Sequence, residues 1–182
     1  MQMAELDGEE LLVLARLDIE KGAFEGALSK LKAAASLSGA PPEAALELAR
    51  LYAQLRLFSK AEAQFVKVLD SSGRDYPDVR FQLGMVRFEK GDIAGAIACW
   101  DKVLEADAGY PPALYYYSVA LGRIGRREEA RTRLATLVRL VPSDNLYHGK
   151  AKELLGTLAS LSSGDTDADT VMKPEASSAT QH

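Results

Sequence analysis

The architecture is decided by the stretch LGMVRFEKGDIAGAIACW, residues 83–100, in which small residues stand at fixed distances from one another. Gly84 lies twelve positions before Ala96, and the large apolar Trp100 follows Ala96 by four positions. The same small, alanine and large apolar pattern occurs three more times, at Ala15, Ala27 and Leu31, at Ala49, Ala61 and Phe65, and at Ser118, Ala130 and Leu134. The alanines are 34, 35 and 34 residues apart, a period that predicts stacked helix-turn-helix repeats.

This period divides the chain into four repeats, 8–41, 42–75, 77–110 and 111–144, with Tyr76 as an extra residue. Each repeat contains two apolar-periodic segments, which predict two helices joined by a short turn. The expected helices are 10–21 and 24–37, 43–55 and 58–70, 78–90 and 93–105, and 112–124 and 127–140. Three of the four turns contain glycine, which adopts the left-handed conformation without strain. Arg56 replaces it in the second repeat and is expected to be strained.

Several short motifs recur in phase with the repeats. Leucine precedes the small residue in Leu14-Ala15, Leu48-Ala49 and Leu83-Gly84, and the third repeat continues with Gly91-x-Ile93-x-x-Ala96. With these motifs the chain resembles the tetratricopeptide repeat family over residues 8–144. The resemblance implies an all-α fold, an α-solenoid of stacked antiparallel helix-turn-helix repeats that form a right-handed superhelix with a concave groove. It also implies that the first helix of each repeat lines this groove.

The segments outside the repeats have different compositions. Residues 1–7 are an N-terminal extension, and residues 145–161 form an amphipathic pattern with Leu146, Leu154, Leu155 and Leu158 on one stripe. The family resemblance suggests that 145–161 is a capping helix, and an open end of a repeat stack needs such a cover. Residues 162–182 are rich in Ser, Thr, Asp and Ala, a composition that predicts disorder.

Charge and composition exclude several classes of protein. The net charge is −4, of which the segment 162–182 carries −3, so the remainder is almost neutral and lacks the basic stripe of a nucleic-acid binder. The single cysteine, Cys99, cannot form an internal disulfide, which favours a reducing compartment. Because the N-terminus lacks a secretory pattern and no apolar run approaches the length of a bilayer span, we expect a cytoplasmic protein without membrane insertion.

Candidate groove residues follow from helical spacing within the four first helices. They combine apolar and aromatic side chains with flanking arginines: Leu12, Arg16, Leu46, Arg50, Phe81, Met85, Phe88, Tyr115, Tyr116 and Arg123. A partner segment with apolar anchors and one or two acidic residues would match this set. We expect Phe81 and Tyr115 to be the anchors and Arg50 to pair with a carboxylate of the partner.

Structural roles for the same residues are equally open. Apolar stripes on helices are usually core, and Arg16 and Arg50 can pair instead with Glu20, Glu43 or Glu47. Glu9, Glu43 and Asp78 form an acidic column, but each occupies the first turn of its helix, where the helix dipole favours negative charge. One subclass of the family binds the C-terminal carboxylate of chaperones through basic groove residues. The matching positions here are Leu12, Arg16, Glu47, Asp78 and Gln82, so no such carboxylate clamp is expected.

Evidence for other chemistry is weak. Six arginines between Arg123 and Arg139 form a basic cluster, which is expected to be a solvated convex face because it lacks interleaved aromatic residues. No metal-ligand spacing, phosphate loop or nucleophile motif is present, so we expect no metal, no cofactor and no enzyme activity. The sequence therefore predicts a protein-interaction module, such as an adaptor, scaffold or assembly chaperone, that binds a peptide or helix of a partner. The alternative is a structural unit that self-associates into homo-oligomers, and an enzyme subunit is the weakest hypothesis.

Overall fold

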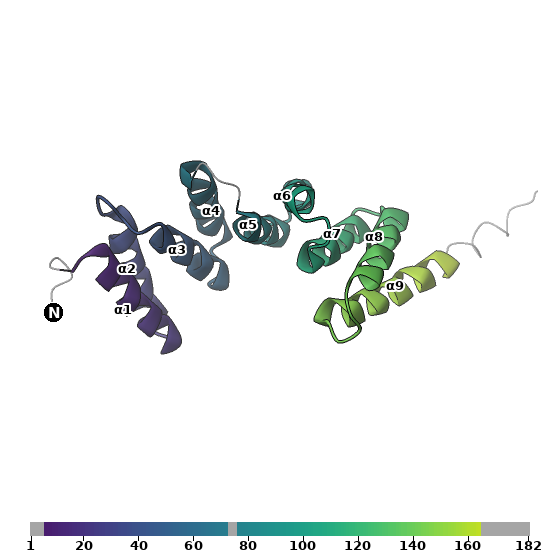
Figure 1. The fold of residues 1–182 in the computed structure, drawn as a ribbon, viewed down its shortest axis with the longest axis horizontal. Coiled ribbons are helices and arrows are strands. Elements are labelled where there is room, and N and C mark those ends of the chain that lie inside the picture. Colours follow the sequence, from purple (N-terminus) through teal and green to yellow (C-terminus); the bar gives the residue numbers. More distant parts are fainter. Residues whose placement is uncertain (1–5, 73–75, 165–182) are drawn as a thin grey trace, which may run out of the picture. The chain divides into compact units, whose positions relative to one another are not determined.

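The computed structural model describes residues 6–72 and 76–164, and within these ranges it consists of nine helices (Figure 1). The helices are α1 Gly8–Glu20, α2 Phe24–Ser36, α3 Pro42–Gln54, α4 Phe58–Ser72, α5 Pro77–Glu89, α6 Ile93–Ala106, α7 Pro111–Arg123, α8 Arg127–Leu140 and α9 Leu146–Gly164. The predicted all-α repeat fold is confirmed, since successive helices pack in pairs. The chain divides into two compact units, Met1–Ala113 and Leu114–His182, which are described separately below.

Local sequence explains where the helices begin and end. Asp7 and Glu10 form a reciprocal capping box at the start of α1, which satisfies two otherwise unpaired backbone N–H groups. Proline is the first residue of α3, α5 and α7, where its missing N–H has no cost. Gly22, Gly91 and Gly125 adopt positive φ in the turns within repeats, and Arg56 adopts φ of 57° at the equivalent place. The guanidinium of Arg56 lies over the ring of Phe58, 5.2 Å from its centroid.

In the first unit, the two helices of each repeat pack together at buried small residues. In the first unit, α1 packs with α2, α3 with α4 and α5 with α6, and Ala15, Ala27, Ala49, Ala61 and Ala96 are all completely buried. In the second unit the buried Ser118 donates its hydroxyl hydrogen to the carbonyl of Leu114 at 2.7 Å. Its polar group is therefore satisfied within α7.

The large apolar residues fill the spaces beside these crossings. Leu31, Phe65, Trp100 and Leu134 are almost entirely buried, as their spacing predicts. Trp100 is the largest of them, and it lies in the repeat whose first helix carries glycine in place of alanine or serine. A Cβ atom added to Gly84 would collide with the indole of Trp100. The size of the side chain at position 84 is therefore limited by the large indole at position 100.

Neighbouring repeats in the first unit are joined by an ion-pair cluster between α4 and α5. The Glu62 carboxylate accepts hydrogen bonds from Arg87 Nε at 2.9 Å and from Lys90 Nζ at 2.5 Å. Arg87 Nη1 also lies 3.5 Å from the sulfur of buried Cys99. The hydrogen bond from Lys90, followed by that from Arg87, lowers the pKa of Glu62 below its ordinary value, against the opposing effect of desolvation.

In the second unit α9 packs against α8, and its residues Ala151 and Leu158 are buried. Leu154 and Leu155 are half-buried, whereas Leu146 is 65% exposed, so its predicted place on the packed stripe is wrong. The helix begins at Leu146 and continues to Gly164, so residues 162–164 are helical where the sequence predicts disorder. Nothing in this stretch forces an earlier end, and glycine at its last position is a common helix terminus. The predicted disorder of 165–182, and residues 1–5 of the predicted extension, lie outside the described residues.

Substitution of Gly84 tests the coupling to Trp100. Gly84→Ala is expected to lower the free energy of unfolding by about 1–3 kcal/mol, because the new methyl group overlaps the indole. Gly156→Ala is the matched control, since nothing lies within contact distance of a methyl group there. That control should leave stability unchanged or raise it by up to about 1 kcal/mol, because alanine favours helix. Urea unfolding followed by circular dichroism measures both, and equal stability of Gly84→Ala and wild type would contradict the proposed packing.

The Glu62 cluster predicts a pH-dependent contribution to stability. A carboxyl whose pKa is lowered by folding stabilises the protein above its unfolded pKa, and this gain is lost as pH falls through the folded pKa. Glu62→Gln should therefore lower the free energy of unfolding by about 1 kcal/mol at pH 7, and the difference should shrink below pH 4.5, its ordinary value. Thermal unfolding of both proteins at pH 7 and pH 3 measures this, and a difference that does not change with pH would contradict it.

Candidate functional site

The predicted groove residues of the first unit divide into core and surface. Leu12 and Phe88 are only 2% and 4% exposed, so they belong to the interior and offer no surface to a partner. Leu12 packs within the main apolar cluster, and the ring of Phe88 lies 5.8 Å from that of Trp100. Leu46, Phe81 and Met85 are half-buried, so part of each side chain faces solvent.

Phe81 makes aromatic contacts that limit its role as an anchor. Its ring centroid lies 6.4 Å from Trp100 and 5.7 Å from Tyr110, the latter in an edge-to-face arrangement. Trp100 Nε1 also donates a hydrogen bond to the Phe81 carbonyl at 3.3 Å. Burial, followed by the nearby carboxylates of Asp78 and Asp107, raises the pKa of Tyr110. Phe81 is thus partly structural, and Tyr110, which the spacing argument did not select, supports it.

The arginines of the predicted groove are engaged by acidic neighbours. Glu47 lies 3.5 Å from Arg16 and 3.6 Å from Arg50, so one carboxylate on α3 joins a cation from α1 and one from its own helix. Arg50 also donates from Nε to the Gln82 amide oxygen at 3.1 Å, and its Nη2 lies 3.8 Å from Asp78 on α5. These polar contacts link the first helices of three repeats. A partner carboxylate would have to compete with them.

In the second unit, the predicted residues Tyr115 and Tyr116 belong to an aromatic cluster that includes α9. The Tyr115 ring lies 5.3 Å from Tyr116 and 5.7 Å from Tyr147. The Lys150 ammonium lies 5.8 Å from the Tyr115 ring and 5.6 Å from the Tyr147 ring. Burial raises the pKa of Tyr115, as do Tyr116 and Glu153. Sequence reasoning missed Tyr147 and Lys150, although an aromatic residue in the first turn of the predicted cap was a usable signal.

The remaining arginines of the second unit are on or near α8. Arg123 is exposed. Arg126 forms two hydrogen bonds with Glu129, Arg131 lies 3.3 Å from Glu128, and the Arg133 guanidinium lies 3.9 Å from the centroid of the Tyr117 ring. Within the described part of the unit, these local partners reduce the basic character that the sequence suggested. The prediction that nucleic acid does not bind stays untested.

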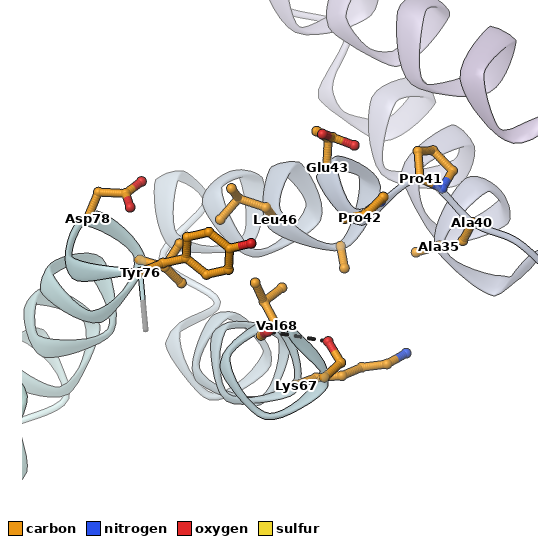
Figure 2. A pocket seen from close by; sticks show the side chains of 13 residues that line it. Ala35, Ala40, Pro41, Pro42, Glu43, Leu46, Lys67, Val68, Tyr76 and Asp78 are labelled. Atoms are coloured by element: carbon orange, nitrogen blue, oxygen red, sulfur yellow. Dashed lines mark hydrogen bonds between the residues drawn. The ribbon is translucent and has the colours of Figure 1, made fainter. Parts of the chain in front are cut away.

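A hollow of about 750 Å³ lies within the first unit, and sequence reasoning did not identify it (Figure 2). It is bounded by the end of α2, the first turns of α3 and α5, and the last turns of α4. Its lining is mainly apolar, with charged residues from three helices: Ala35, Ala40, Pro41, Pro42, Glu43, Ala45, Leu46, Lys67, Val68, Ser71, Tyr76, Asp78 and Val79. Leu46 is the one residue shared with the predicted groove set.

Side chains from α3, α4 and the start of α5 surround this hollow. Figure 2 shows the Tyr76 ring between Leu46 above and Val68 below, and it shows Glu43 and Asp78 on the wall formed by α3 and α5. Lys67 comes from α4 across the hollow, with its ammonium directed away from Asp78. The arrangement provides an apolar recess with a carboxylate-bearing wall, and such a recess accommodates a side chain or a small ligand.

Among the residues that the structure describes, no group of three or more His, Cys, Asp or Glu is placed to hold a metal ion. Within residues 6–72 and 76–164, no helix combines the length and apolar character that crossing a membrane requires.

Comparison with known proteins identifies the repeats. A family model described as tetratricopeptide repeat matches residues 18–82 and 87–155. A search of curated proteins found no match. Among solved structures, the chain is similar to YrrB, a TPR protein with an unusual peptide-binding site, with 19% identity and a TM-score of 0.70 over 86% of this chain and 78% of that one.

Two other solved structures are similar in fold. The MamA protein has 16% identity and a TM-score of 0.69, covering 93% of this chain and 98% of its own. The first TPR of Spaghetti (RPAP3), bound to the HSP90 peptide SRMEEVD, has 16% identity and a TM-score of 0.59, covering 67% of this chain and 93% of its own. At these identities, the similarity establishes the shared fold.

Proposed function

Because the chain belongs to the tetratricopeptide repeat family, we propose that it is an interaction module that binds a segment of a partner protein. The apolar hollow of the first unit is the proposed docking point for a partner side chain. Its volume of about 750 Å³ is within the range of sites that hold compact ligands. This hollow is the observation that carries the proposal.

The fold comparisons support a peptide as the kind of ligand. YrrB has a peptide-binding site, and the RPAP3 domain was solved with a bound peptide. The half-exposed apolar residues Leu46 and Met85 would extend the contact along the first unit. In the second unit, the half-exposed Tyr115 and Tyr116 are a separate candidate surface for the same kind of ligand.

The arginines have a lesser part in this proposal. Arg16 and Arg50 already pair with Glu47, so a partner carboxylate gains little by replacing that contact. A clamp for a chaperone C-terminus is not proposed, because Glu47 and Asp78 occupy positions where it needs basic groups. The protein is proposed to act by binding rather than by catalysis, and its cytoplasmic location stays a prediction.

Filling the hollow tests the docking point. Ala45→Phe should place a ring in the recess without removing any core contact, and it should reduce recovery of a bound partner by about tenfold or more. Ala63→Phe, on the exposed face of α4 and outside the hollow, is the matched control and should leave recovery unchanged. Affinity purification from the native cell extract, quantified by mass spectrometry, compares both with wild type. Equal recovery of every protein by wild type and Ala45→Phe would contradict this docking point.

A second candidate function is self-association through α1. Val13 and Leu17 lie one helical turn apart, and they are 53% and 42% exposed. Apolar side chains that adjoin on one helix face are typical of a protein contact surface. A second copy of the chain would cover them in an assembly built from repeated contacts.

The oligomeric state tests this second function. The wild-type molar mass is expected to rise above 19.7 kDa with increasing concentration, and Val13→Asp combined with Leu17→Asp should keep the protein monomeric. Both positions are exposed, so the double variant should retain its helical content. Light scattering coupled to size-exclusion chromatography measures the mass. A wild-type mass equal to that of the monomer at every concentration would exclude self-association.

A further inference from the structure

The charges around the hollow specify the chemistry of the segment that it would bind. We propose, building on the function proposed above, that the hollow binds a partner segment in which a large apolar residue is flanked by lysine or arginine. This differs from the acidic partner that the arginines of the sequence predict. The reason lies in which charges the fold neutralises and which it leaves exposed beside the hollow.

The apolar part of the recess selects the anchor. Leu46, Val68 and Tyr76 face one another across it, and Ala35, Ala45 and Val79 complete its apolar lining. The alanines leave room that larger residues would fill. Burying a leucine, methionine or aromatic side chain there would remove apolar surface from water, which favours binding. An apolar anchor is therefore required, but it does not by itself choose between acidic and basic partners.

The nearby cation is already neutralised. Arg50 is shared between Glu47, Asp78 and Gln82, with distances of 3.6, 3.8 and 3.1 Å. An acidic partner residue would gain attraction to Arg50 but would also meet the carboxylates that surround it. The partner carboxylate would be repelled by the carboxylates of Glu47 and Asp78, and this repulsion would offset its attraction to Arg50.

The carboxylates on the wall of the hollow are less fully engaged. The Asp78 side chain is 57% exposed, and its ion pair with Arg50 is long at 3.8 Å. Glu43 is exposed and forms no ion pair within the described part of the chain. Both residues line the recess, one on α3 and one on α5, so a cation that flanks the anchor on either side would approach one of these two carboxylates. Charge complementarity therefore favours a basic flank.

Two features oppose this preference and provide controls. Lys67 lines the recess from α4, and its charge would weaken the attraction for a cation. Glu43 and Asp78 are also first-turn residues of α3 and α5, where their charges favour the helix dipole. Glu9 has the same first-turn position in α1 and does not line the hollow, so Glu9→Gln separates the helix effect from the binding effect.

The experiment uses three sets of short fluorescent peptides that differ only in the flanks. Each peptide carries one central leucine, methionine, phenylalanine or tryptophan, flanked on both sides by lysine, by glutamine or by glutamate. Fluorescence polarisation measures their affinity for the full-length protein at low and high salt. Lysine-flanked peptides should bind about threefold to tenfold more tightly than glutamate-flanked ones at low salt, and this preference should decrease at high salt.

Substitutions identify the residues that cause the preference for lysine-flanked peptides. Glu43→Gln combined with Asp78→Asn should remove the advantage of lysine flanks, while Glu9→Gln should retain it. Lys67→Gln should strengthen binding of lysine-flanked peptides. Ala45→Phe should abolish binding of all three sets, because it fills the apolar recess itself.

The outcomes distinguish this inference from the proposed function. Equal affinity of the three sets, tighter binding of glutamate flanks, or a lysine preference that survives the Glu43 and Asp78 substitutions would overturn the basic-partner inference. If Ala45→Phe still abolished binding in those cases, the hollow would remain the peptide site. Failure of all three sets to bind wild type, or binding that Ala45→Phe does not change, would overturn both.

Discussion

The structure depends on the close crossing of two helices within each repeat. Ala15, Ala27, Ala49, Ala61 and Ala96 are completely buried at these crossings, where a larger side chain would separate the helices. Trp100 illustrates this limit on side-chain size, because its indole fits only where Gly84 has no side chain. With this spacing set, the large apolar residues one turn further on fill the remaining space and are almost entirely buried. The capping box and the prolines mark where helices begin, and the positive-φ turns mark where the first helix of a repeat ends.

Ion pairs and hydrogen bonds join neighbouring repeats of the first unit. Glu62 on α4 joins two cations of the third repeat, and Glu47 on α3 joins the arginines of the first and second repeats. Such partly exposed ion pairs contribute modestly to stability, but they engage these charged side chains within the protein. The charged groups that stay available at the surface are therefore those that neighbouring repeats pair weakly or not at all. Beside the apolar hollow of the first unit, these groups include the carboxylates of Glu43 and Asp78.

Helical spacing predicted which residues share a helix face, but it did not predict how deeply each side chain is buried. Leu12 and Phe88 have the spacing of surface residues, yet both are buried, because neighbouring apolar side chains, including Trp100 in the case of Phe88, cover them. Glu47 was among the expected partners of Arg50, and the two side chains do form an ion pair. The contacts of Arg50 with Gln82 and Asp78, about thirty residues away, required the folded repeats. Tyr147 was missed as a neighbour of Tyr115, because it comes from the cap and lies outside the repeat period.

By itself, the sequence determined the repeat period, the all-helical fold, the positions of the turns and the residues at each crossing. These features depend on local propensity and on a pattern that recurs four times, so they can be read without knowing which elements meet. Only the tertiary structure decided which predicted groove residues are exposed, which charges are neutralised and where a hollow remains. The hollow is bounded by α2, α3, α4 and α5, and its existence depends on the volumes of side chains that no single helix brings together.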